Sequence, residues 1–215
     1  MRRRDDGSIE LRVNGVFVMD DVETTSEERL GRAVLDLGAE DILVGGLGLG
    51  HTLRTLLATP DVCRVIVAVL HPEIVDWMRD GTIPGADLLA DPRTEVAIDD
   101  VRTVVAAQPA ASLDAIVLDV DNGPDFLVHD ANAEVYSAPF LATCAERLRP
   151  GGAVCIWSMA ESAPLREAMA EQLVDVRADA VPVTLQGRAE RYWIFIGTRE
   201  DSHSCREGDR GAAIS

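Results

Sequence analysis

Short apolar segments alternate with amphipathic helical segments along most of the chain, and this alternation constrains the fold more than any other feature. Strands are expected at 41–44, 64–70, 95–98, 114–118 and 153–157, and helices at 25–37, 51–58, 72–79, 101–108, 134–147 and 162–173. Thr25 and Glu28 have the spacing of a capping box, which would start the first helix. An unbroken apolar run such as 114–118 is typical of a strand that helices cover on both faces. The pattern predicts an α/β fold with a mostly parallel, doubly wound sheet.

Antiparallel segments are expected at both ends of this core. Residues 9–20 alternate apolar and polar side chains about Asn14-Gly15, a strong hairpin signal because both residues tolerate positive φ. Residues 176–184 and 192–198 are expected to pair through Gln186-Gly187 as an antiparallel C-terminal edge. We therefore predict a disordered start at 1–8, a small N-terminal β-hairpin at 9–24, one α/β domain at 25–199 and a disordered tail at 200–215.

The charge balance is strongly acidic. The chain has 37 acidic residues against 20 basic ones, all arginine, which gives a net charge of −17. Such a surface repels phosphate backbones and anionic lipid, so neither nucleic acid nor a membrane is expected as a partner, and a small neutral or cationic ligand is favoured. No apolar run approaches the roughly 20 residues of a membrane span, so a cytoplasmic location is expected. The four cysteines have no metal-ligand spacing with the histidines, and no metal site is expected.

A glycine-rich turn follows the first predicted strand. Missing side chains there allow a ligand to approach the backbone, and the next helix offers free N–H donors. The alternative is a turn whose glycines serve only tight packing. The candidate donor-binding residues of this turn are Gly45, Gly46, Gly48 and Gly50.

Acidic side chains follow the third and fourth predicted strands. Asp119, Asp121 and Asn122 could accept hydrogen bonds from an amine, or remove its proton before attack, but they also suit an ordinary polar turn. Asp99 or Asp100 could receive an adenine amino group, or simply cap the helix that begins at 101. In a parallel sheet these positions meet at the carboxyl edge of the strands, where ligands bind.

Three further residues are candidates for the same edge. His71, just past the second strand, could hydrogen-bond a ribose or a substrate carboxylate, or could serve only as a turn residue. Tyr136 could line the pocket of the acidic loop or only cover the core. Trp157, at the end of the fifth strand, is placed to border the site.

Four stretches follow one another in an order typical of a known family: LRVNGVFVMD, ILVGGLGLG, LDAIVLDVDNGP and EVYSAPFLATCAERLRPGGAVCIWS. They resemble the spermidine synthase-like aminopropyltransferases, and the likeness covers roughly residues 9–199. The resemblance implies a Rossmann-like class I methyltransferase fold, a homodimer, and transfer of an aminopropyl group from decarboxylated S-adenosylmethionine to a polyamine. It also implies that the turn at 45–50 holds the donor, that Asp100 contacts the adenine amino group and that Asp119 accepts the proton.

Several positions depart from the family pattern. Val69 stands where the family has an acid that holds the ribose hydroxyls, and 31–33 replaces a Tyr-His-Glu stretch of the amine pocket. Val18, Gly48 and Asn122 replace a glutamine and two aspartates. A pocket for a dicationic diamine needs several carboxylates, because a desolvated, unpaired ammonium is costly. Classical spermidine synthesis is therefore less favoured than the resemblance alone implies.

Two hypotheses follow for the function. The leading one is a transferase that binds S-adenosylmethionine, its decarboxylated form or a related thioether nucleoside and moves an aminopropyl or methyl group to a small amine. The alternative is a non-catalytic, degenerate family member that acts as a dimeric binding or structural protein.

Overall fold

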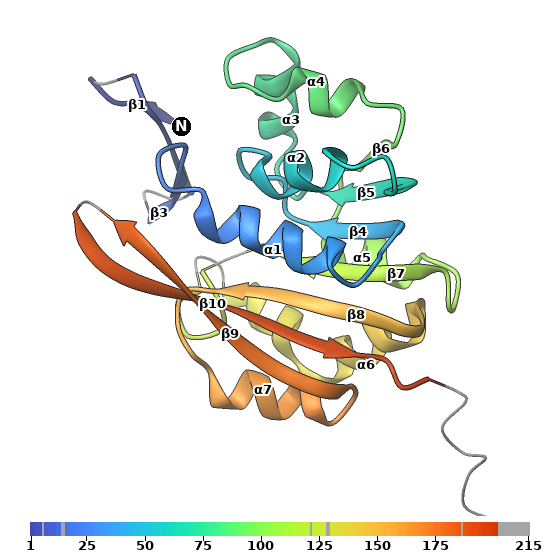
Figure 1. The fold of residues 1–215 in the computed structure, drawn as a ribbon. Coiled ribbons are helices and arrows are strands. Elements are labelled where there is room, and N and C mark those ends of the chain that lie inside the picture. Colours follow the sequence, from blue (N-terminus) through green and yellow to red (C-terminus); the bar gives the residue numbers. More distant parts are fainter. Residues whose placement is uncertain (6, 14–15, 121, 128–129, 186, 202–215) are drawn as a thin grey trace, which may run out of the picture.

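A seven-stranded mixed sheet forms the centre of the molecule (Figure 1). The structure, a computed structural model, describes residues 1–201 apart from 6, 14–15, 121, 128–129 and 186. The strands are β4 (Asp41–Gly45), β5 (Arg64–Ala68), β6 (Thr94–Ala97), β7 (Leu113–Leu118), β8 (Leu148–Ser158), β9 (Val174–Leu185) and β10 (Arg188–Thr198). Their order is β6-β5-β4-β7-β8-β10-β9, and β10 runs antiparallel to both of its neighbours. The predicted fold class, with its antiparallel C-terminal edge, is confirmed.

The strand order reverses between β4 and β7. The chain runs outward from β4 through β5 to β6 and then returns to β7 on the other side of β4. Gly45 at the end of β4 pairs in register with Leu118 at the end of β7. The loops that follow these two strands therefore leave the sheet side by side, at the point where open α/β sheets bind their ligands.

Helices cover both faces of the sheet, and the sheet separates the core into two apolar clusters. One face is covered by α1 (Thr25–Leu35), α2 (His51–Leu57), α3 (Pro72–Arg79) and α4 (Ala86–Ala90), and the other by α5 (Val101–Ala106), α6 (Ala138–Arg147) and α7 (Ala163–Ala170). Side chains alternate between the faces as strand geometry requires: Val44 and Trp157 lie on the α1 face, whereas Leu43 and Ile156 lie on the α6 face.

A small N-terminal sheet packs on the α1 side of the core. It consists of β1 (Arg2–Arg3), β2 (Ile9–Val13) and β3 (Val16–Asp20), all antiparallel. Ile9 and Leu11 are buried in the same cluster as α1 and α2. The predicted hairpin is confirmed, although its turn at 14–15 lies outside the described residues. Residues 1–8 were expected to be disordered, but the structure pairs Arg2 and Arg3 with β2.

The helix boundaries differ from the prediction at two places. The N-cap of α1 is Thr24, whose Oγ1 donates to Glu28 Oε1 at 3.0 Å, so the expected cap at Thr25 is wrong by one residue. The single helix expected at 134–147 is divided into a 3-10 helix at Asp130–Tyr136 and α6, because the Ser137 hydroxyl accepts from Phe140 N and starts a new helix.

Among the helices that the structure describes, none combines the length and the apolarity needed to cross a bilayer. Most of the tail expected at 200–215 lies outside the described residues.

Candidate functional site

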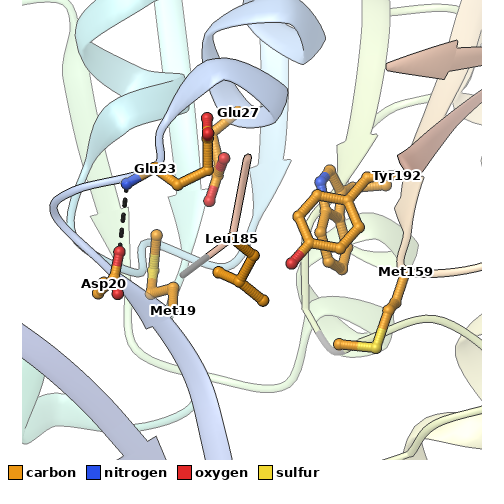
Figure 2. Close-up of a pocket in the computed structure, with 8 residues that line it drawn as sticks. Met19, Asp20, Glu23, Glu27, Met159, Leu185 and Tyr192 are labelled. Carbon is orange, nitrogen blue, oxygen red and sulfur yellow. Dashed lines mark hydrogen bonds between the residues drawn. The ribbon is translucent and has the colours of Figure 1, made fainter. Parts of the chain in front are cut away.

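A cavity lies at the carboxyl edge of β4 and β7, and a second cavity adjoins it. The larger has a volume of about 110 Å³ and is bordered by the loops after β4, β5 and β7 and by the N-terminal sheet. The smaller, of about 20 Å³, lies between β3, the start of α1 and the β9–β10 pair (Figure 2). The two cavities share Met19, Glu27 and Trp157, so they adjoin one another.

Asp119 borders the larger cavity directly beyond the buried strand β7. Its Oδ2 accepts a hydrogen bond from Thr52 Oγ1 of α2 at 3.3 Å. Desolvation raises the pKa of Asp119 to about 6, against the lowering effect of the Thr52 hydroxyl. A carboxyl with a pKa near neutrality can accept a proton from a bound amine and release it again.

The glycine turn brings the β4 loop into close contact with the backbone of Asp119. Gly46 has a φ of 95°, and a Cβ at this position would lie 2.0 Å from the Asp119 carbonyl oxygen. Gly48 has a φ of 51°, and its Cβ would lie 2.6 Å from Met19 Sδ. These glycines therefore allow the chain to pack against itself, which was one of the two alternatives for this turn. Gly48 also lines the larger cavity, so the turn still borders a ligand-sized space.

Glu27, in the first turn of α1, lies where the two cavities meet. Only 7% of its surface is exposed, and Ser26 Oγ donates to its Oε2 at 2.6 Å. No ion pair among the described residues includes it. Burial raises the pKa of Glu27 to about 7, and the nearby charge of Asp119 adds to this rise. No sequence signal singles out Glu27, because a glutamate in the first turn of a helix is an ordinary surface feature.

Acidic and aromatic side chains face each other across the smaller cavity. Figure 2 shows the carboxylates of Glu23 and Glu27 on one side and the Tyr192 ring on the other. Asp20 pairs with Arg4 at 2.9 Å and accepts from the backbone N of Glu23 at 3.2 Å.

The aromatic side of the smaller cavity is built from β8 and β10. The Tyr192 and Trp157 rings pack together with centroids 4.9 Å apart and planes tilted by 58°. Burial raises the pKa of Tyr192, and the charge of Glu27 adds to the rise. Carboxylates opposite aromatic faces are a combination that attracts an ammonium group.

Five of the predicted site residues meet at the larger cavity: Gly48, His71, Asp119, Asn122 and Trp157. They come from the loops after β4, β5 and β7 and from the end of β8, as expected from the topology. Asp121, the second catalytic candidate, lies outside the described residues. Gly45, Gly46 and Gly50 support the turn without lining either cavity.

The other candidates lie away from both cavities. Asp100 caps α5 by accepting from Arg102 N at 2.8 Å, and the Arg102 guanidinium lowers its pKa. Asp99 accepts from Asp100 N. Tyr136 is buried in the core cluster on the α6 face, so the expected pocket-lining position is not observed. The cap and the core position are the alternatives given above for Asp100 and Tyr136, and the adenine contact of Asp100 stays a prediction.

The residues present fit part of an adenosyl donor. Val69, at the position of the expected ribose acid, is buried and apolar, so no carboxylate is offered there. The imidazole of His71 lines the cavity close by in sequence, and Trp157 Nε1 is buried without a hydrogen-bond partner among the described residues. A cavity of about 110 Å³ is smaller than the roughly 300 Å³ of a typical small-molecule site. Met19 lines this cavity and packs over Gly48.

The strand order, the two helical layers and the cavity at the strand-order reversal define a Rossmann-like class I methyltransferase fold. The solved spermidine synthase in complex with the transition state analogue AdoDATO has a TM-score of 0.75 to this chain, covering 96% of it and 74% of that protein at 14% identity. No protein-family model matches the chain.

Two curated relatives show the same likeness in sequence. Putrescine N-methyltransferase 3 of Nicotiana tabacum is 30% identical over 135 residues, which is 62% of this chain. Polyamine aminopropyltransferase 2 of Pseudomonas aeruginosa is 34% identical over 123 residues, or 54% of this chain. The matched regions span about a third of each relative, 33% and 32%. The resemblance to the spermidine synthase-like family is thus confirmed, with the low identity of a divergent relative.

Proposed function

We propose that this chain is a polyamine-type transferase that moves an alkyl group from an S-adenosylmethionine-type sulfonium to a small amine. The observation that carries the proposal is the larger cavity at the strand-order reversal together with the smaller cavity that adjoins it, with Asp119 in the larger one and Glu27 lining both. The names of the two curated relatives support the proposal, since one is an aminopropyltransferase and the other a putrescine N-methyltransferase.

The carboxylates beside the smaller cavity supply negative charge for a cationic acceptor. Asp20, Glu23 and Glu27 come from β3 and the start of α1, and not from the positions where the family pattern has its acids. Because an ammonium needs a compensating negative charge when it leaves water, this acidic side supports a cationic acceptor.

The sulfonium donor, when bound, supplies a carbon that is already activated toward a nucleophile. The protein therefore has to align the amine and accept its proton. Asp119 is placed to do the latter, since its side chain borders the larger cavity and has a pKa near neutrality. Gly48 borders the same cavity without a side chain, so the donor could approach its backbone once Met19 moves away from the turn.

The charges around the cavities favour the decarboxylated donor. Neither described set of lining residues contains an arginine, and the chain has no lysine, so the carboxylate of intact S-adenosylmethionine would face Glu27 and Asp119 with His71 as the one basic side chain in those sets. Decarboxylated S-adenosylmethionine has an ammonium at the same end of the molecule but no carboxylate. We therefore favour aminopropyl transfer over methyl transfer.

Calorimetry with decarboxylated S-adenosylmethionine, S-adenosylmethionine and methylthioadenosine tests the proposal. The decarboxylated donor should bind best, and mass spectrometry should then detect transfer to a small diamine such as putrescine. Asp119→Asn should lower turnover far more than donor affinity. The proposal fails if none of the three nucleosides binds below about 1 mM, or roughly −4 kcal/mol.

A second function is favoured by two specific observations: Val69 offers no ribose-binding carboxylate, and Met19 packs over the glycine turn. These features suit a non-catalytic protein that binds a nucleoside or an amine without turnover. Methylthioadenosine binding with no transfer to any amine in the assay above would support this alternative. The homodimer and the cytoplasmic location remain proposals, and sedimentation analysis of the purified chain tests the dimer.

A further inference from the structure

Glu27 is the carboxylate that both cavities share. Asp119 lines only the larger cavity, whereas Asp20 and Glu23 line only the smaller one. Thr52 links the two sides of the larger cavity, because its Oγ1 lies 3.3 Å from Asp119 Oδ2 and 3.4 Å from the backbone oxygen of Glu27. Glu27 therefore lies between the expected donor position and the acidic end of the acceptor pocket.

The surroundings of Glu27 leave its charge uncompensated. The groups that titrate around it come from each neighbouring element: Asp119 after β7, Glu23 before α1, Asp20 on β3, Tyr192 on β10 and His71 after β5. All of these except His71 are acidic. Asp20 already pairs with Arg4, and Glu23 accepts from the backbone N of Thr25 and Thr184 at 3.0 Å each.

An independent observation points to a ligand at the same place. The indole ring of Trp157 is 7% exposed and lines both cavities, and its Nε1–H has no partner within the described part of the chain. A buried donor without an acceptor is costly, so this group suits a site that a polar molecule completes. Tyr192 packs against the same indole, which adds a second aromatic face for a cation.

We propose that Glu27 and Asp119 act as one carboxyl pair that shares a proton, in which Glu27 binds the reacting ammonium and takes its proton. This inference rests on the proposed function. It assigns the proton transfer to a residue of α1 in addition to the aspartate after β7, and it explains why both carboxyls face one cavity.

The proposed step balances as follows. The ammonium R–NH₃⁺ gives one proton to the carboxylate pair and becomes a neutral amine with a free electron pair. That nitrogen bonds to the carbon attached to the sulfonium sulfur while the carbon–sulfur bond breaks, and the bonding electrons stay on sulfur as a neutral thioether. The product nitrogen is a secondary ammonium, and the pair returns its proton to water.

A carboxyl titration followed by NMR tests the pair without any need for turnover. With ¹³C-labelled glutamate, the Glu27 signal is the one that disappears in Glu27→Gln. We expect it to titrate near pH 7 and to move toward the ordinary glutamate range in Asp119→Asn, because the charge of Asp119 is one cause of its raised pKa. An ordinary midpoint in the wild type, or no movement in Asp119→Asn, would overturn the proposal even if the chain binds its donor.

Kinetics test the role of the pair in the reaction. Glu27→Gln should lower kcat by about 100-fold or more, the usual size of a general-base effect, and should remove the rise of kcat near neutral pH. Donor affinity measured by calorimetry should change by less than about threefold, or roughly 0.7 kcal/mol. Glu28→Gln, which removes a neighbouring charge outside both cavities, is the matched control and should keep the wild-type rate.

The outcomes separate this inference from the proposed function. If Glu27→Gln keeps the rate and the pH profile of Glu28→Gln, Glu27 takes no proton and the inference is wrong although the transferase stands. If the wild type binds no donor, the proposed function fails, while the NMR titration still decides whether the pair exists. Circular dichroism shows whether each variant folds.

Discussion

Replacing Glu27 by glutamine should change how the stability of the protein depends on pH. Glu27 is 7% exposed, and its pKa is raised from 4.5 to about 7. The folded state therefore keeps a proton that the unfolded chain loses above pH 4.5. The contribution of Glu27 to stability is highest below pH 4.5 and falls as the pH rises toward 7, because ionising the buried carboxyl opposes folding.

The size of the effect follows from the two pKa values. Each tenfold change in proton affinity corresponds to ~1.4 kcal/mol, so the full destabilisation above pH 7 is about 3 kcal/mol. Because the isoelectric point is near 4.5, the titration is best started at pH 5.5. Between pH 5.5 and 8.5 the wild type should lose about 2 kcal/mol relative to Glu27→Gln, which carries no ionisable group at this position.

Urea unfolding at a series of pH values, followed by tryptophan fluorescence, measures this difference by linear extrapolation. Glu28→Gln should run parallel to the wild type, because Glu28 lies outside both cavities. In an Asp119→Asn background the effect of Glu27→Gln should shrink, because the charge of Asp119 is one cause of the raised pKa of Glu27. A constant difference between wild type and Glu27→Gln from pH 5.5 to 8.5 would show that Glu27 ionises as an exposed glutamate and would refute the reasoning.

Three further predictions concern single positions. Gly46→Ala should destabilise the fold by about 3 kcal/mol or more in the same urea assay, because a Cβ would lie 2.0 Å from the Asp119 carbonyl oxygen. The control Gly38→Ala, in open space at a φ of 71°, should cost only about 1 kcal/mol. Tyr192→Ala should raise the KM of the amine by about tenfold and Tyr192→Phe much less, because the ring face supplies the cation contact; equal effects of the two would assign the contact to the hydroxyl instead. Asp100→Ala should lower stability by about 1 kcal/mol as a lost helix cap, and calorimetry on the same variant tests the predicted adenine contact, which an unchanged donor affinity would contradict.

Local signals were enough to predict most of the fold. The α3 helix has the predicted bounds of 72–79, because Pro72 suits its first turn and the following Asp80-Gly81 ends it. The strand β8 is longer than expected, from Leu148 to Ser158, since Gly151 and Gly152 continue to pair with the last strand through Arg199 instead of forming a free turn. That pairing joins distant parts of the chain, which no local pattern reveals.

The site was predictable only where it follows directly from the sheet. Asp119, Asn122 and Trp157 stand at strand ends, so the topology alone brings them together. Glu23 and Glu27 lie at the start of α1, and they face the site because β9 and β10 pack against this helix. The hydrogen bond from Thr184 to Glu23 spans 161 residues, a contact that depends on the complete fold.

A crystal structure of the chain with methylthioadenosine and a small diamine would test the proposed site most directly. We expect the thioether sulfur beside Gly48, with Met19 moved away from the turn, and one amine nitrogen within hydrogen-bond distance of Glu27 or Asp119. The second nitrogen should lie near Glu23 in the smaller cavity. A nucleoside bound elsewhere, or an amine outside both cavities, would contradict the transferase proposed here.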